Sequence, residues 1–121
     1  VNFLVEGITK NIEKFGLAYC GLGRSDIDHY INILVTRCNK IKSLNIALNS
    51  ITDETLMSIM ENLKNTLEEL DIGTCCNITD SKLLEMKSMP KLKVLNYFNP
   101  WDSNYEDLKN NLPQLNYNLS M

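Results

Sequence analysis

Four cysteines and one histidine are the side chains of this chain with the greatest capacity for metal binding or nucleophilic chemistry. They are Cys20, Cys38, Cys75, Cys76 and His29. No two cysteines form a Cys-x-x-Cys pair, and the spacing of His29 from Cys20 and Cys38 matches no common zinc site. We therefore expect no metal site. We also expect reduced thiols, as in a cytoplasmic or nuclear protein.

Two carboxylates, Glu69 and Asp71, form the other group with chemical potential. Residues two apart on a strand project from the same face, and paired acids can serve as general acid and base. However, the sequence has no Gly-rich phosphate-binding loop, and it gives His29 no partner for a nucleophile–base pair. We expect a solvated or partner-binding pair, and we predict that the chain is not an enzyme and uses no cofactor.

A repeat positions these residues. Residues 41–53 read as LxxLxLxxNxITD, and residues 67–80 read as LxxLxLxxCxxITD. The same apolar spacing opens near residues 12, 41, 67 and 92, at intervals of 29, 26 and 25 residues, and a closing stub opens near residue 112. This period and this consensus are typical of leucine-rich repeats. Cys20 and Cys75 take the ninth position, where a small buried side chain packs.

The segments between the openings predict helices. In residues 27–34, and again one repeat later, apolar side chains recur at i, i+3, i+4 and i+7, which is one stripe of a helix. We expect Ser25 or Asp26 to cap the first helix. Asp53 and Asp80 are expected to cap the next two, because a short side-chain oxygen accepts hydrogen bonds from the free N–H groups of the first turn.

Each repeat is therefore predicted to contain a strand, a turn and a helix, whose apolar faces are buried when repeats stack. The expected fold is α/β: a leucine-rich repeat solenoid of the ribonuclease-inhibitor-like type, with a parallel concave sheet and convex helices. We expect residues 1–121 to form one domain of about four repeats, with residues 1–11 the tail of a preceding repeat. The expected strand core is Leu44, Ile46, Leu70, Ile72, Leu95 and Tyr97.

The outward-facing strand positions are the candidates for recognition, because packing does not dictate their side chains. Extended concave surfaces are what repeat solenoids present to partners, and exposed aromatic groups often anchor such interfaces. Gly73 also falls at an outward position. The predicted protein-binding residues of the concave face are Tyr19, Ser43, Asn45, Leu48, Glu69, Asp71, Thr74, Asn96 and Phe98.

Composition narrows the class of partner. The net charge is −3 and the Lys and Arg residues are scattered, so we expect no nucleic-acid binding, which needs clustered cations. No apolar run approaches the roughly 18 residues of a membrane span, and the first ten residues lack the pattern of a signal peptide. We therefore expect a protein partner that binds the concave face, and we expect the chain to be a monomer.

The ITD turn, the cysteine at the ninth position and the 26-residue interval together resemble the cysteine-containing leucine-rich repeats of F-box proteins. The resemblance covers about residues 41–118. It is greatest over residues 83–98 and 108–118, where a P-x-L-K-x-L opening, a variant turn and a closing L-P-x-L follow one another. The resemblance implies a substrate-recognition subunit of an SCF-type ubiquitin ligase, with an F-box that binds a Skp adaptor and thereby a cullin.

No F-box is visible, because the motif begins near a Leu-Pro pair and the one such pair here is Leu112-Pro113. We therefore expect a fragment or a truncated relative. The alternative is a leucine-rich repeat assembly factor or scaffold without ligase coupling. The coupling-factor family of ATP synthase resembles such an array and also closes in L-P-x-L, but it needs an Arg-rich amphipathic transit segment that these residues do not show.

Overall fold

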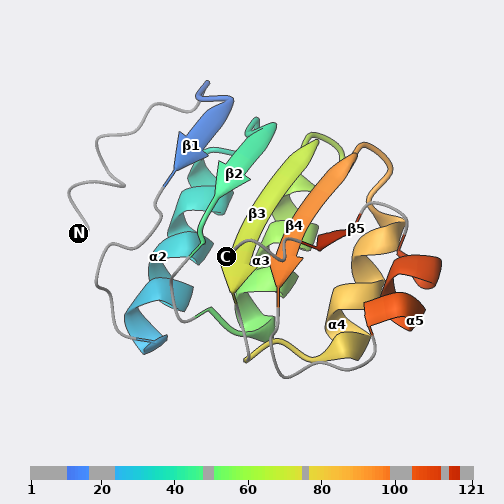
Figure 1. Ribbon diagram of the computed structural model, residues 1–121. Helices are drawn as coiled ribbons and strands as arrows, with labels where there is room; N and C mark the ends of the chain where they lie inside the picture. Colours follow the sequence, from blue (N-terminus) through green and yellow to red (C-terminus); the bar gives the residue numbers. More distant parts are fainter. Residues whose placement is uncertain are drawn as a thin grey trace.

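The computed structural model describes residues 11–16, 24–47, 51–74, 77–98, 105–112 and 115–117, apart from the side chains of residues 24–26, 74, 98, 105 and 115–117. Strands and helices alternate along the chain (Figure 1). The strands are β1 (Lys14–Gly16), β2 (Ser43–Asn45), β3 (Glu69–Thr74), β4 (Val94–Phe98) and β5 (Leu115–Tyr117). The helices are α2 (Arg24–Arg37), α3 (Asp53–Leu63), α4 (Asp80–Leu84), the 3-10 helix η1 (Glu85–Ser88) and α5 (Tyr105–Asn111).

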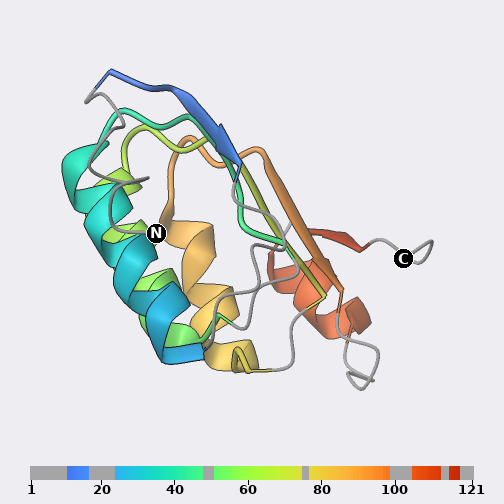
Figure 2. The same ribbon diagram turned by 90° about the vertical axis from the view of Figure 1, so that its left-hand side faces the viewer.

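These strands form one parallel sheet in the order β1-β2-β3-β4-β5. Leu44 of β2 is aligned with Phe15 on one side and with Leu70 on the other. Leu95 continues the row, aligned with Leu70 and with Leu115. The helices α2, α3 and α4 lie side by side on one face of the sheet (Figure 2). The other face, which we call the open face, is covered by no described helix. The chain is thus an α/β repeat fold, in which helical segments join successive parallel strands.

The core lies between the sheet and the helices. Alternation along each strand turns the fourth and sixth repeat positions toward the helices, and each helix buries one apolar stripe against them. The expected core residues of the strands are confirmed, because each is at most 1% exposed. The buried side chains include Leu44, Leu70, Ile72, Leu95 and Tyr97 from the strands, Ile46 directly after β2, and Ile27, Ile31, Leu34, Leu56, Ile59 and Leu63 from the helices.

The predicted caps of α3 and α4 were wrong by one residue. Thr52 and Thr79 are the N-caps, and each has an extended backbone and a hydroxyl that accepts a hydrogen bond from an N–H group of the first helical turn. Asp53 and Asp80 are the first helical residues instead. The β-branched threonine suits the extended backbone that an N-cap requires, and the aspartate after it is released for other contacts.

The first helix also begins earlier than predicted. It begins at Arg24, so Ser25 and Asp26 are helical and neither is the N-cap of α2. Helix α2 has 14 residues and α3 has 11, a difference of three residues. The first repeat interval, of 29 residues, is longer than the second, of 26, by the same amount. Among the described segments, no helix has the length and apolar character needed to cross a membrane.

Candidate functional site

The open face of the sheet carries two rows of aligned side chains. Neighbouring strands lie about 4.8 Å apart, so aligned side chains on one face are close neighbours. Because Leu44 and its equivalents point toward the helices, the residues on either side of them point away. From β1 to β4, the rows are Lys14, Ser43, Glu69 and Val94, and then Gly16, Asn45, Asp71 and Asn96.

The structure brings together the predicted binding residues from β2, β3 and β4. Asn45 and Glu69 are exposed, and Ser43, Asp71 and Asn96 are half-buried. We call these five residues the sheet face. Tyr19 and Leu48 lie outside the described residues, as do the side chains of Thr74 and Phe98. Participation in binding stays a prediction for all nine residues.

Two side chains of the sheet face are held by the main chain. The Ala47 N–H donates to Oδ1 of Asn45 at 3.0 Å, and the Gly73 N–H donates to Oδ1 of Asp71 at 2.9 Å. Each bond joins a side chain to the backbone two residues further on, a local turn that Asn and Asp favour. Asn45 and Asp71 are therefore positioned in the same way on adjacent strands.

Gly73 differs from its predicted outward position, because it is buried. The alignment of β3 with β4 shifts between Asp71 and Gly73, so Ile72 is an extra residue on β3. Gly73 takes a φ of 56°, in the left-handed region that a residue without a Cβ adopts at little cost. The irregularity turns the end of β3 and aims the Gly73 N–H at the Asp71 carboxylate.

The residues that directly precede β1 to β4 form a row in which oppositely charged side chains make ion pairs. The Lys42 ammonium lies 3.7 Å from the Glu13 carboxylate, and the Lys93 ammonium lies 3.6 Å from that of Glu68. These pairs are solvent-exposed and add little stability. They do, however, make this row electrically neutral.

The centre of the sheet face is negatively charged by contrast. Glu69 accepts a hydrogen bond of 3.4 Å from the Ser43 hydroxyl. Neither Glu69 nor Asp71 makes an ion pair with any described residue. Burial raises the pKa of the Asp71 carboxyl above its usual range, and the Gly73 N–H opposes part of that rise. Two carboxylates two residues apart therefore give β3 a local negative charge on the sheet face.

Replacing Asp71 with asparagine is expected to stabilise the protein at pH 7. A raised pKa means that the ionised carboxylate costs folding free energy above that pKa, and that the cost disappears below the unfolded value of about 3.9. The amide cannot ionise and can still accept from the Gly73 N–H, as Asn45 accepts from Ala47. Denaturant unfolding at pH 7 and pH 3.5 should show a stability gain at the higher pH that shrinks at the lower.

The matched control is Asn45→Asp, which introduces the same carboxyl in the same turn at an exposed position of β2. The carboxyl introduced at position 45 should change the free energy of unfolding with pH less than the Asp71 carboxyl does. A gain from Asp71→Asn that grows as the pH falls would contradict the assigned cause.

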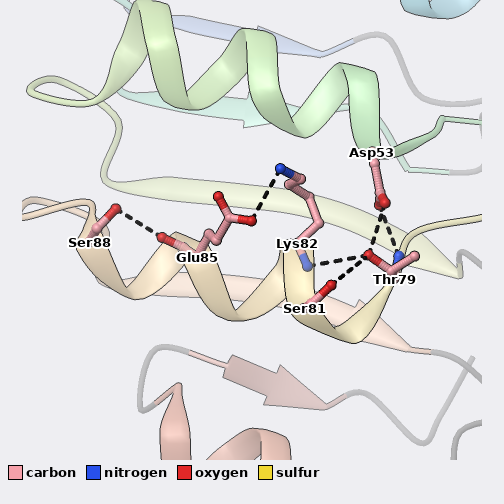
Figure 3. Close-up of polar contacts among 6 residues, drawn as sticks. All are labelled: Asp53, Thr79, Ser81, Lys82, Glu85 and Ser88. Carbon is pink, nitrogen blue, oxygen red and sulfur yellow. Dashed lines mark hydrogen bonds and ion pairs between the residues drawn. The ribbon is translucent and has the colours of Figure 1, made fainter.

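The helix layer contains side-chain contacts between repeats that the sequence reasoning missed. The Asp53 carboxylate, at the start of α3, accepts from the Thr79 N–H and from the Thr79 hydroxyl, both at 2.8 Å (Figure 3). The same hydroxyl accepts from the Lys82 N–H at 3.3 Å and caps α4. Lys82 in turn pairs with Glu85 at 3.1 Å. One threonine thus both caps its own helix and binds the helix of the preceding repeat.

The pattern recurs one repeat earlier. The Asp28 carboxylate of α2 accepts from the Thr52 hydroxyl at 2.7 Å and from the Thr52 N–H at 3.3 Å. It also accepts from the hydroxyl of Thr55, which is fully buried. We call these contacts, from Asp28 to Thr52 and from Asp53 to Thr79, the Thr–Asp contacts. They satisfy helix N-terminal donors and join neighbouring repeats.

A groove runs between α2 and α3, on the side of the molecule away from the sheet face. We call it the helix groove. Four carboxylates contribute to its lining, and the described lining residues include no lysine or arginine. Its lining residues include Asp28, His29 and Asn32 from α2, and Glu54, Met57 and Glu61 from α3.

His29 is separated from the two acids of the sheet face, Glu69 and Asp71. His29 lies on α2 in the helix layer, whereas Glu69 lies on the opposite side of the sheet. Cys38 is a buried thiol, and burial raises its pKa, an effect that Arg37 partly offsets. Within the described segments, no group of three His, Cys, Asp or Glu residues could hold a metal ion. What the sheet face offers is charge and hydrogen bonds.

Residues 37–60 match a family model described as "Leucine Rich repeat". The matched segment runs from the end of α2 through β2 into α3, and it includes Ser43 and Asn45. No curated protein matches this chain. Leucine-rich repeats are protein-interaction modules, so the chain carries at least one repeat of a class that binds proteins.

The repeat consensus held a signal for the Thr–Asp contacts. Asp53 ends one ITD turn and Thr79 belongs to the next, so the motif itself places a donor and an acceptor in successive repeats. Assigning the aspartate to its own helix as a cap obscured this. The contact is evident only when two repeats are placed side by side.

Proposed function

We propose that the chain is a non-enzymatic protein-binding module, a leucine-rich repeat solenoid of the ribonuclease-inhibitor-like type. In this proposal the sheet lies on the concave side, because helices are wider than strands across a stack. The observation that carries the proposal is the sheet face, where side chains from β2, β3 and β4 lie in aligned rows and none packs against the helices.

We further propose that the partner is the substrate of an SCF-type ubiquitin ligase. Residues 83–98 and 108–118 resemble the closing repeats of the S-phase kinase-associated F-box protein. On this proposal the repeats hold the substrate in the cytoplasm or the nucleus. The Skp adaptor and the cullin bind through an F-box outside these residues.

Affinity capture tests the proposal, with this chain and the full-length gene product as parallel baits and mass spectrometry as the readout. The ligase proposal expects the full-length bait to recover the adaptor and the cullin, and this chain to recover a substrate without them. Recovery of inner-membrane subunits of mitochondria would favour an assembly factor instead. Absence of both adaptor and cullin from the full-length capture overturns the ligase proposal.

Glu69→Lys is expected to weaken binding of the captured substrate by about tenfold, because it places a cation at the acidic centre of the sheet face. Glu69 is exposed, so the fold should tolerate the change. Asp71 is a less suitable position, since its carboxylate also holds the Gly73 N–H. Titration calorimetry with the purified substrate measures the Kd.

Glu106→Lys supplies the matched control for this substitution. It makes the same charge change at an exposed position of α5, away from the sheet face. Both variants should melt cooperatively. An equal loss of affinity in both would trace the effect to net charge and contradict the assignment of the sheet face.

A further inference from the structure

The helix groove is a second candidate interaction surface, separate from the sheet face. We propose that it binds a cationic segment of a partner protein in which two basic side chains bracket an apolar one. The proposal does not depend on the function of the sheet face, because α2 and α3 lie on the other side of the sheet (Figure 2).

The α3 side of the groove supplies both apolar and charged contacts. Glu54, Met57 and Glu61 are spaced by three and four residues and therefore lie along one face of the helix. Seven residues of helix place the two carboxylates about 10 Å apart. Met57, between them, is 44% exposed, and no other large hydrophobic side chain in the described part of the chain is exposed. An apolar anchor of the partner would bury this methionine on binding.

The charges of the groove select a cation. Asp28 and Asp53 already accept hydrogen bonds from threonines, which fixes their carboxylates in the lining without neutralising them. Neither Glu54 nor Glu61 forms an ion pair with a described residue. Because the described lining residues carry four carboxylates and no lysine or arginine, the groove repels phosphates and acidic segments and attracts lysine or arginine.

A hydrogen bond between the two helices fixes the spacing of the groove walls. The Ser58 hydroxyl of α3 donates to Oδ1 of Asn32 on α2 at 3.0 Å. Below it, Ile31 and Ile59 are fully buried in the core. A surface that is already formed loses little conformational freedom on binding, which favours affinity for a short segment.

Nuclear magnetic resonance titration of the 15N-labelled chain tests the proposal. The probe is a short synthetic peptide in which two lysines, three residues apart, bracket a leucine, since an extended peptide spans about 10 Å in three residues. We expect chemical-shift changes at amides of α2 and α3. The double variant Glu54→Lys with Glu61→Lys should weaken binding about tenfold, and Met57→Ala about threefold.

Glu106→Lys with Asp107→Lys on α5 makes the same change in net charge at two exposed sites outside the groove, and should leave the peptide affinity unchanged. A peptide with glutamates in place of the lysines should not bind. Equal weakening by the α5 variant, shift changes on the strands instead of the helices, or no shift at millimolar lysine peptide would each overturn the proposal.

Discussion

Leu70→Ala is expected to lower the free energy of unfolding by about 3 kcal/mol or more. Leu70 lies in the central strand β3, is 1% exposed, and is aligned with Leu44 and Leu95 on the adjacent strands. Truncation removes buried apolar contacts and leaves a cavity that parallel strands on both sides hinder from collapsing. Urea unfolding followed by circular dichroism measures the change. The melting temperature should fall by roughly 10 °C or more.

The matched substitution is Met57→Ala, which also shortens a long apolar side chain to alanine but at a position 44% exposed. Its cost should stay within about 0.5 kcal/mol. A cost below about 1 kcal/mol for Leu70→Ala would mean that Leu70 does not point into the core, and the strand register would then be wrong.

Asp28→Ala is expected to lower the free energy of unfolding by about 2–3 kcal/mol. Its carboxylate accepts from the Thr52 N–H, the Thr52 hydroxyl and the Thr55 hydroxyl. Thr55 is fully buried, so its hydroxyl would lose this acceptor where water cannot replace it. Denaturant unfolding provides the measurement. Asp28→Asn should fall between wild type and alanine, since the amide keeps one acceptor oxygen.

Glu61→Ala serves as the comparison for Asp28→Ala. Glu61 is exposed and lines the same groove, and it makes no ion pair with the described residues. Its loss should change stability by less than about 0.5 kcal/mol. If the two variants have equal stability, the Thr–Asp contacts do not join the repeats energetically.

The sequence by itself determined the order of strands and helices and the residues that form the strand core. A repeat of fixed apolar spacing is compatible with few folds, because neither the strand nor the helix can bury its apolar side chains alone. Each strand must therefore turn Leu44 or its equivalent toward a helix. The parallel alignment of Leu44 with Leu70 and Leu95 follows from the same repeat positions. Ser43, Asn45, Glu69, Asp71 and Asn96 reach the open face because alternation leaves them no other direction.

Only the tertiary structure decided the features that depend on two repeats at once. The Thr52 and Thr79 hydroxyls each cap a helix of their own repeat and donate a hydrogen bond to an aspartate of the preceding repeat. Local preferences for cap residues predict the first of these interactions but not the second. The helix groove has the same origin, since its sides come from α2 and α3. The inward turn of Gly73 arises where β3 gains a residue relative to β4, a mismatch that neither strand shows by itself. Spacing along one chain predicts what each repeat buries, whereas contacts across repeats arise only when their backbones are stacked.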